Sequence, residues 1–451
     1  MKPTYWLNEP RNGCRSSGGD GGRRMDDGTG SVAGPVRDFL HFLFANIVYF
    51  AFGKFLNSKS KNSKLVAALL DWFAANARDL PWRRTRDPYA IWVSEIMLQQ
   101  TQVKTVIPFW ERWLRELPTI EAAATAPSAK IHKLWEGLGY YTRVRNLQKA
   151  AQQIANRRRD EFHESPSKNK VRNSRRSSVR FPEKFEDILA LPGIGRYTAG
   201  AICSIAFNQP RPILDGNVIR VLTRIFGIAE NPKEKETNKL LWQIAEALVF
   251  RAKAQSSQSR KLPAFAVSAP LREKVACSFL NQSLMELGAL VCTPKNPQCR
   301  ICPVKKLCVA FKENRVDDLP NLGPREAATA RRFLAFVIER DGKFLVQQRP
   351  AGVVNAQLWE FPNAEITRTK PDAKAVFKNL FGVEPATVHP LRTVKHSITR
   401  YRITLEAFAV QLASGPEKSA GRWRTPAQMQ SLAFTSAHRK VLQASRAGDG
   451  R

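Results

Sequence analysis

The chain has 451 residues, 43% of them hydrophobic with 25 phenylalanines, which excludes a wholly unstructured chain and allows two or three domains with real cores. Its 72 lysines and arginines outnumber 39 aspartates and glutamates, and a net charge of +33 indicates a polyanionic partner, nucleic acid before an anionic membrane surface. The seven cysteines form no regular disulfide framework, which favours a reducing compartment.

The N-terminal segment has no pattern of a folded domain. Residues 1–37 are rich in Gly and Arg without helical or strand periodicity, and we expect them to be disordered. Residues 39–56 are nearly all apolar and about as long as a membrane span, yet they include His41, Asn46 and Lys54. We therefore expect residues 1–60 to be an extension without a folded role, with a membrane anchor as the alternative, and SKSKNSK (58–64) to separate it from the folded body.

A helical half follows. Apolar residues recur at helical spacing in 65–77, and further helices are predicted over 90–106, 107–117, 122–139 and 140–157. No alternating strand pattern occurs before about residue 330. Two polar insertions, 157–180 and 252–270, are predicted to be surface loops, and residues 313–331 read as an interdomain linker.

The periodicity changes after the linker. Residues 331–340 and 343–350 alternate like strands on either side of an Asp-Gly turn, and residues 399–412 predict another strand. Helices are predicted over 370–382 and 435–446. The C-terminal third is therefore predicted to be a small α+β domain.

Four cysteines cluster with the spacing C-x6-C-x2-C-x5-C: Cys292, Cys299, Cys302 and Cys308. Zinc sites usually combine two C-x-x-C pairs or mix cysteine with histidine, whereas this loop has one such pair and no histidine. The pattern predicts a metal centre and suits an iron–sulfur cube at least as well as zinc.

The segment LPGIGRYTAGAI (191–202) predicts a tight turn between two helices. Pro192, Gly193 and Gly195 would form the turn and leave backbone N–H groups pointing outward at the start of the second helix. Such a hairpin binds a DNA phosphate without reading sequence, although an ordinary helix–helix turn has the same composition.

Two carboxylates are candidates for acid–base chemistry. Asp215, in Leu-Asp-Gly-Asn, stands at a predicted helix start, where an aspartate is usually only an N-cap. Glu95 lies in an otherwise apolar helix, and it either faces solvent or is buried with a raised pKa that suits a general acid. Neither residue decides the function by itself.

The combination of these features resembles the endonuclease III superfamily of helix-hairpin-helix DNA glycosylases. Within it, five motifs are similar to the adenine DNA glycosylase (MutY) family: residues 80–103, 135–147, 191–202, 213–222 and 281–299. The resemblance is dense over 64–312 and looser in the C-terminal domain, and it omits residues 1–60 and both insertions. It implies a mainly α fold: a helix-hairpin-helix glycosylase domain (64–312) with a 4Fe–4S loop, a linker (313–331) and an α+β Nudix-like recognition domain (332–445).

The resemblance also implies roles for the catalytic residues. Glu95 would protonate a flipped-out adenine, Asp215 would stabilise the cationic sugar, and Asn217 and Tyr197 would orient the sugar, Asp215 and the water. Relatives with lyase activity carry a lysine where this chain has Tyr197. We therefore expect a monofunctional glycosylase with little or no strand cleavage.

Substrate contacts carry over in the same way. Positions of the adenine pocket match Arg78, Trp82, Leu98 and Gln282, and contacts to 8-oxoguanine opposite the adenine match Gln100, Thr101, Leu138 and Tyr140. In the C-terminal domain, Ile398, Thr399 and Arg400 stand where the family has a Phe-Ser-His loop that probes the oxidised base. The cysteine loop would present its cations to phosphate: Lys295, Arg300, Lys305 and Lys306.

Two other functions stay open at this stage: a thymine- or pyrimidine-directed glycosylase of the same fold, and a catalytically idle DNA-binding relative. The acidic Mg²⁺-binding helix of Nudix hydrolases is missing, so we expect no pyrophosphate hydrolysis. We expect a monomeric, cytoplasmic, nucleoid-associated protein that binds duplex DNA with A:8-oxoguanine or A:G mismatches and does not act at a membrane.

Overall fold

The computed structural model describes residues 59–163, 179–258, 276–324, 327–367, 372–398, 400–412 and 421–447. The chain divides into two compact units, which we call the cysteine unit (Met1–Arg78 and Gly200–Leu322) and the hairpin unit (Asp79–Ala199 and Gly323–Arg451). The predictions for residues 1–58, including the apolar segment 39–56, lie outside the described residues. Among the helices that are described, none combines the length and apolar character needed to span a membrane.

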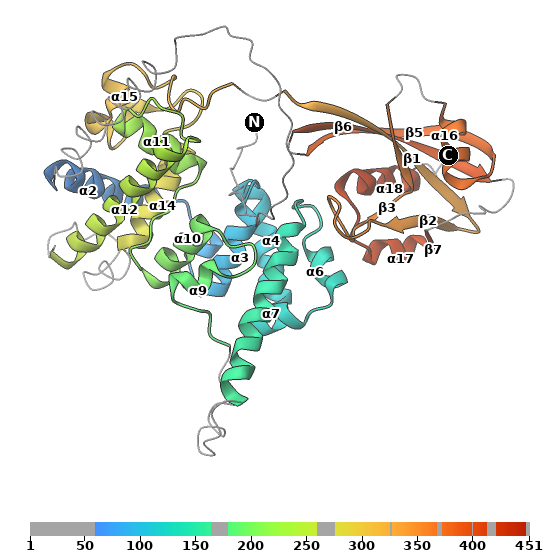
Figure 1. Cartoon of the computed structure of the whole chain (residues 1–451), viewed down its shortest axis with the longest axis horizontal. Helices are drawn as coiled ribbons and strands as arrows, with labels where there is room; N and C mark the ends of the chain where they lie inside the picture. The colour runs from blue at the N-terminus through green and yellow to red at the C-terminus, as the bar shows by residue number, and fades with distance from the viewer. Residues whose placement is uncertain are drawn as a thin grey trace, which may run out of the picture. The chain divides into compact units, whose positions relative to one another are not determined.

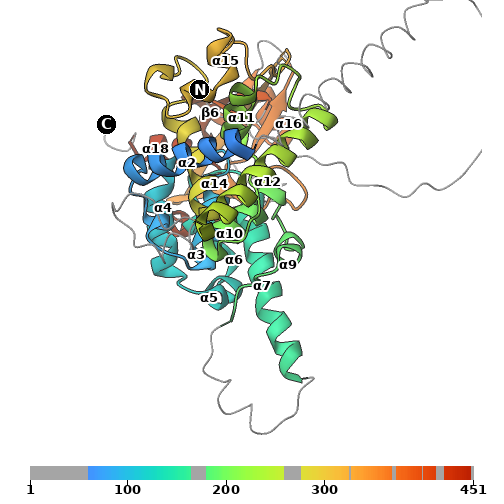
Figure 2. The same cartoon turned by 90° about the vertical axis from the view of Figure 1, so that its left-hand side faces the viewer.

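The cysteine unit is helical. Helix α14 packs against α2, α11 and α12, and Figure 2 shows it beside α2 and α12. The cysteine loop follows α14 as two short 3₁₀ turns and then α15, which packs on α11. The elements are α2 (Lys59–Asn76), α11 (Gly216–Phe226), α12 (Lys235–Gln258), α14 (Ala276–Leu290), η2 (Cys299–Ile301), η3 (Lys305–Leu307) and α15 (Val309–Lys312).

The helical part of the hairpin unit surrounds α3, whose residues are buried from Tyr89 to Met97. Asp87 caps α3 by accepting from the backbone N–H groups of Tyr89 and Ala90, and Pro88 occupies the first helical position. The elements are η1 (Pro81–Arg83), α3 (Pro88–Leu98), α4 (Val103–Glu116), α5 (Ile120–Thr125), α6 (Ser128–Leu134), α7 (Thr142–His163), α9 (Phe185–Leu189) and α10 (Arg196–Phe207), whose first turn belongs to this unit.

Four sequence-based boundaries are wrong. The helix predicted over 122–139 is two short helices, α5 and α6, the second of which ends at Leu134. The helix predicted over 90–106 is broken between α3 and α4, because Gln100 adopts a left-handed conformation with φ of 56°. SKSKNSK is helical from Lys59 onward rather than a separator. Both predicted loops begin as helix, since α7 continues to His163 and α12 to Gln258; residues 164–178 and 259–275 lie outside the described part.

The C-terminal part of the hairpin unit is a mixed sheet (Figure 1). Strand order is β3-β2-β1-β6-β5, with β1 parallel to β6 and the other pairs antiparallel; β4 pairs with β1 and β7 with β2. The predicted Asp-Gly turn is confirmed, with left-handed Asp341 and Gly342 between β1 and β2. The strands are β1 (Thr329–Arg340), β2 (Lys343–Gln348), β3 (Trp359–Glu360), β4 (Asn363–Ile366), β5 (Pro385–Ile398), β6 (Tyr401–Leu412) and β7 (Arg422–Arg424).

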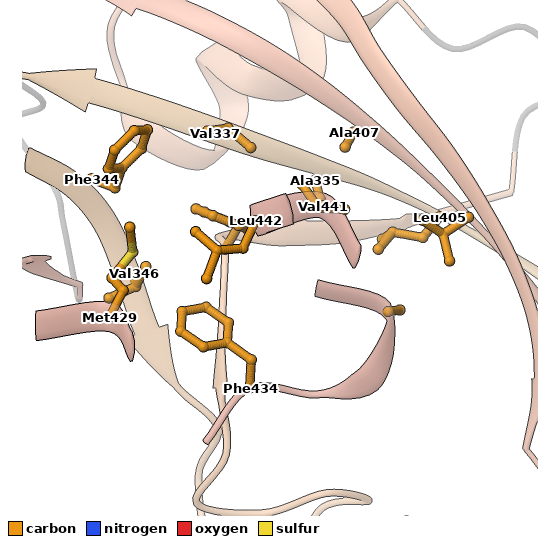
Figure 3. Packing of buried hydrophobic residues seen from close by; sticks show 13 residues of the cluster. Ala335, Val337, Phe344, Val346, Leu405, Ala407, Met429, Phe434, Val441 and Leu442 are labelled. Carbon is orange, nitrogen blue, oxygen red and sulfur yellow. The ribbon is translucent and has the colours of Figure 1, made fainter. Parts of the chain in front are cut away.

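Alternate residues of β1 face two separate apolar cores. Val337 joins a core with Met429 and Phe434, whose side chains converge in Figure 3. Residues of α17 (Pro426–Ser431) and α18 (Ser436–Ala447) contribute to this core. Phe336 joins the other core with Phe377, which belongs to α16 (Ala373–Phe381). The predicted fold class, a helical domain followed by a C-terminal α+β domain, is confirmed.

Candidate functional site

Glu95 and Tyr197 meet within the hairpin unit. The Glu95 side chain is 5% exposed on α3, so its predicted solvent-facing alternative is wrong. The Tyr197 hydroxyl, one residue into α10, donates to Glu95 Oε2 at 2.9 Å. The pair places an oriented carboxyl group in a buried setting.

Asp215 and Asn217 meet within the cysteine unit. Asp215 does cap α11: its Oδ1 accepts from the Val218 N–H at 2.7 Å, and its Oδ2 accepts from Asn217 Nδ2 at 3.0 Å. Burial raises the pKa of Asp215, while these hydrogen bonds and the charge of Arg220 act in the opposite direction. Arg220 in turn donates to Asn217 Oδ1 at 2.8 Å and to the Cys292 carbonyl at 2.7 Å, so it ties Asn217 to the cysteine loop.

The residues predicted to contact adenine occupy both units. In the cysteine unit, Nε and Nη2 of Arg78 donate to the carboxylate of buried Glu286, each at 2.7 Å. Gln282 Nε2 donates to Ser278 Oγ at 2.9 Å. In the hairpin unit, Trp82 is buried and packs edge-on against Trp110, with ring centroids 6.0 Å apart. Leu98 is the half-buried last residue of α3.

The residues predicted to contact the opposite base lie on two loops of the hairpin unit. Gln100 and Thr101 are half-buried in the α3–α4 loop, whereas Leu138 and Tyr140 stand in the α6–α7 loop, where Tyr140 is 37% exposed. Thr399 lies outside the described residues, between β5 and β6. The two described loops are joined by Arg143, an α7 residue that hydrogen-bonds to both.

The Pro-Gly-Ile-Gly segment forms the predicted turn between α9 and α10. Gly193 has φ of 77°, which favours glycine, and a Cβ atom there would lie 2.6 Å from the Cβ of Asn146. Both the backbone conformation and the close packing therefore require glycine at this position. The turn is closed by the Ile194 N–H donating to the Leu191 carbonyl at 3.2 Å. Gly195 directly precedes α10, which begins at Arg196 and whose N-terminal amides suit an anion.

The four cysteines of the loop line one pocket in the cysteine unit. Its other walls are mainly apolar, from α11, α14 and the loop itself, and Arg224 donates to the Cys292 sulfur at 3.4 Å. Burial raises the pKa of the Cys302 thiol to about 12, and the neighbouring sulfurs add to the rise. A bound metal centre would be needed to hold such thiols as thiolates at neutral pH.

A four-thiol donor set in an apolar pocket fits an iron–sulfur cube, in which each thiolate binds its own iron. The described part of the chain gathers no three Cys, His, Asp or Glu side chains in the arrangement of a single-ion site. The cations of the loop, Lys295, Arg300, Lys305 and Lys306, are all exposed.

Three partners of these residues escaped the sequence analysis: Glu286, Arg220 and Arg143. Each contacts residues far away in the sequence; Arg143, for example, donates to carbonyls more than forty positions earlier. Local spacing carries no signal for such pairs. A charged residue on the buried side of an amphipathic helix was the only available hint.

Residues 93–247 match the model of the HhH-GPD superfamily base excision DNA repair protein, and residues 334–444 match that of the NUDIX domain. The adenine DNA glycosylase of Rattus norvegicus is 32% identical over 439 residues, covering 83% of this chain and 76% of that protein. That of Buchnera aphidicola subsp. Schizaphis graminum is 33% identical over 296 residues, covering 65% and 73%. A solved thermostable thymine-DNA glycosylase is 27% identical with a TM-score of 0.43, covering 56% of this chain and 97% of that one.

The motifs of the helical domain, the C-terminal NUDIX domain and the identity to the rat protein agree. The identity extends over most of both chains, well beyond the catalytic motifs. The chain therefore belongs to the adenine DNA glycosylase family, and it is an N-glycosylase of base-excision repair.

Proposed function

We propose that the enzyme removes adenine paired with 8-oxoguanine or guanine, and that it does so as a monofunctional glycosylase. The Glu95–Tyr197 hydrogen bond carries the proposal, because it combines a buried acid with a residue that cannot form a Schiff base. The target adenine must leave the duplex to reach these groups, since stacking hides its glycosidic bond.

Glu95 supplies the proton that adenine needs to leave as a neutral base. The Tyr197 hydrogen bond orients the carboxyl group, which protonates adenine N7. Asp215 remains a carboxylate and stabilises the oxocarbenium-like sugar. The Asn217 side chain holds Oδ2 of Asp215 in position. Water then completes the hydrolysis and leaves an abasic site with the strand intact.

The four loop cysteines are proposed to hold a 4Fe–4S cluster. Their apolar pocket and all-thiol donor set support it, and the exposed cations around the loop favour contact with phosphate. The cluster then has a structural role: it orders the loop that presents these cations.

Metal analysis of the purified protein tests the cluster directly. Four irons and four acid-labile sulfides per chain, with visible absorbance, are expected for the cube. Cys299→Ser should lose iron and absorbance, whereas Cys277→Ser, at a buried cysteine outside the loop, should keep both. One zinc per chain and no labile sulfide would contradict the cluster.

Single-turnover cleavage of a labelled duplex tests the activity. Strand breaks that require hot alkali, and that occur at adenine opposite 8-oxoguanine or guanine but not in A:T pairs, are expected. Breaks without alkali would reveal lyase activity. Cutting at thymine opposite guanine instead would make the enzyme pyrimidine-directed and the opposite-base assignments wrong.

A further inference from the structure

Two residues that are predicted to touch the opposite base share an unusual backbone conformation. Gln100 has φ of 56° and Tyr140 has φ of 48°, both in the left-handed region that side-chain-bearing residues rarely adopt. Such strain persists only where the surroundings hold it, and it gathers at functional sites. Both residues lie in the hairpin unit, on loops separated by α4, α5 and α6 in the sequence.

The side chain of Arg143 reaches the residue before each strained position. Nη1 donates to the Gln99 carbonyl, next to Gln100, and Nη2 donates to the Gly139 carbonyl, next to Tyr140, at 3.1 Å. Nη2 also donates to the Leu138 carbonyl at 3.1 Å and to Thr101 Oγ1 at 3.4 Å. One guanidinium therefore contacts both loops.

The same guanidinium is anchored to the body of the unit. Nη1 donates to the carbonyls of Ile96 at 2.8 Å and Met97 at 3.0 Å, at the C-terminal end of α3, where the helix dipole attracts a cation. The central carbon of the Arg143 guanidinium, Cζ, lies 5.3 Å from the centre of the Trp135 ring and 5.6 Å from the centre of the Tyr140 ring. Within the described part of the chain no carboxylate pairs with it, so carbonyl dipoles and ring faces stabilise its charge.

We propose that Arg143 is a positioning residue that fixes both opposite-base loops at once and thereby sets the preference for 8-oxoguanine over guanine. This rests on the proposed function, in which these loops contact the opposite base. Arg143 itself need not touch DNA: it holds the strained backbone that directs Gln100 and Tyr140. A planar guanidinium with five donors can reach both loops, whereas lysine offers a single donor point.

The test compares Arg143→Met and Arg143→Lys with the unaltered enzyme. Arg112→Met is the matched control, because Arg112 also donates to a backbone carbonyl, that of Leu134 at the end of α6 at 2.8 Å, and stacks on the Phe109 ring, but it does not bridge the two loops. Single-turnover rates are measured with adenine opposite 8-oxoguanine and opposite guanine, alongside thermal unfolding.

Arg143→Met is expected to lower the 8-oxoguanine:guanine rate ratio about 10-fold or more, the size of one or two lost hydrogen bonds. Arg143→Lys should give an intermediate ratio, and Arg112→Met should keep the original one. An unchanged rate ratio in the Arg143 variants, whether both rates fall equally or neither changes, would overturn the proposal. If the Met variant does not fold, the Lys variant decides. An unaltered enzyme that acts equally on both substrates would overturn this inference alone, whereas one that cuts neither would refute the proposed function itself.

Discussion

Glu95 is the single residue whose chemistry is easiest to isolate. Gln is nearly the same size and still accepts the Tyr197 hydrogen bond through its amide oxygen, but it cannot give a proton to adenine. We expect Glu95→Gln to lower the single-turnover rate by about 10²–10⁴-fold, the usual contribution of a general acid. Glu116→Gln, at the exposed end of α4, is the control and should leave the rate unchanged. A Glu95→Gln enzyme of normal activity would show that another group provides the proton.

The charge state of Asp215 should determine the acid limb of the pH–rate profile. Burial raises its pKa, so its carboxylate is lost as pH falls through a value above the ordinary aspartate pKa of about 3.9. Asn217→Ala removes a hydrogen bond to the charged form, which raises the pKa further and moves the midpoint of the limb to higher pH. The measurement is the single-turnover rate against pH for both proteins. A midpoint that stays or moves to lower pH would mean that the acid limb reports a group other than Asp215.

At the scale of elements, the α9–α10 turn depends on glycine for two reasons that can be separated. Gly193→Ala combines left-handed strain with a 2.6 Å contact to Asn146, whereas Gly342→Ala in the β1–β2 turn has the strain, at φ of 66°, with no atom within 4 Å. We expect about 1 kcal/mol of destabilisation for Gly342→Ala and about 1–3 kcal/mol more for Gly193→Ala. Chemical unfolding measures both, and DNA affinity should fall only for Gly193→Ala. Equal losses would mean that the turn has room for a Cβ.

For the whole molecule, the net charge of +33 makes DNA binding depend steeply on salt. Each phosphate neutralised contributes about 0.9 to the slope of log K against log salt concentration. The double variant Lys295→Gln, Lys306→Gln should reduce that slope by about 2, and Lys343→Gln, exposed at the start of β2, should not change it. Fluorescence anisotropy with an undamaged duplex at several salt concentrations gives the slopes. An unaltered slope in the double variant would place the cysteine loop away from the DNA.

Features written in short stretches of sequence were predictable. Cysteine spacing indicated one pocket, which the four side chains do line; the glycines indicated the α9–α10 turn; and Asp215 indicated a helix start. Each depends on neighbouring residues, whose backbone preferences act locally. Strand β5 was missed because its apolar residues do not alternate and its prolines interrupt the pattern, and its pairing comes from β6. The break between α3 and α4 was missed for a related reason, since the loop is held by Arg143 on α7.

The sequence by itself determined the class of the protein: a helical glycosylase domain, a cysteine loop, a C-terminal α+β domain, and a pair of carboxylates with an adjacent tyrosine and asparagine. The helical half, the cysteine loop and the α+β half follow from local spacing and composition, whereas the glycosylase assignment and the set of site residues follow from the resemblance of the motifs to a known family. Only the tertiary structure decided that Glu95 is buried against Tyr197, that Arg220 links Asn217 to the Cys292 carbonyl, and that Arg143 spans two strained loops. Burial and hydrogen bonds between distant segments exist only once the helices have packed, because the energy of a buried charge depends on every group around it.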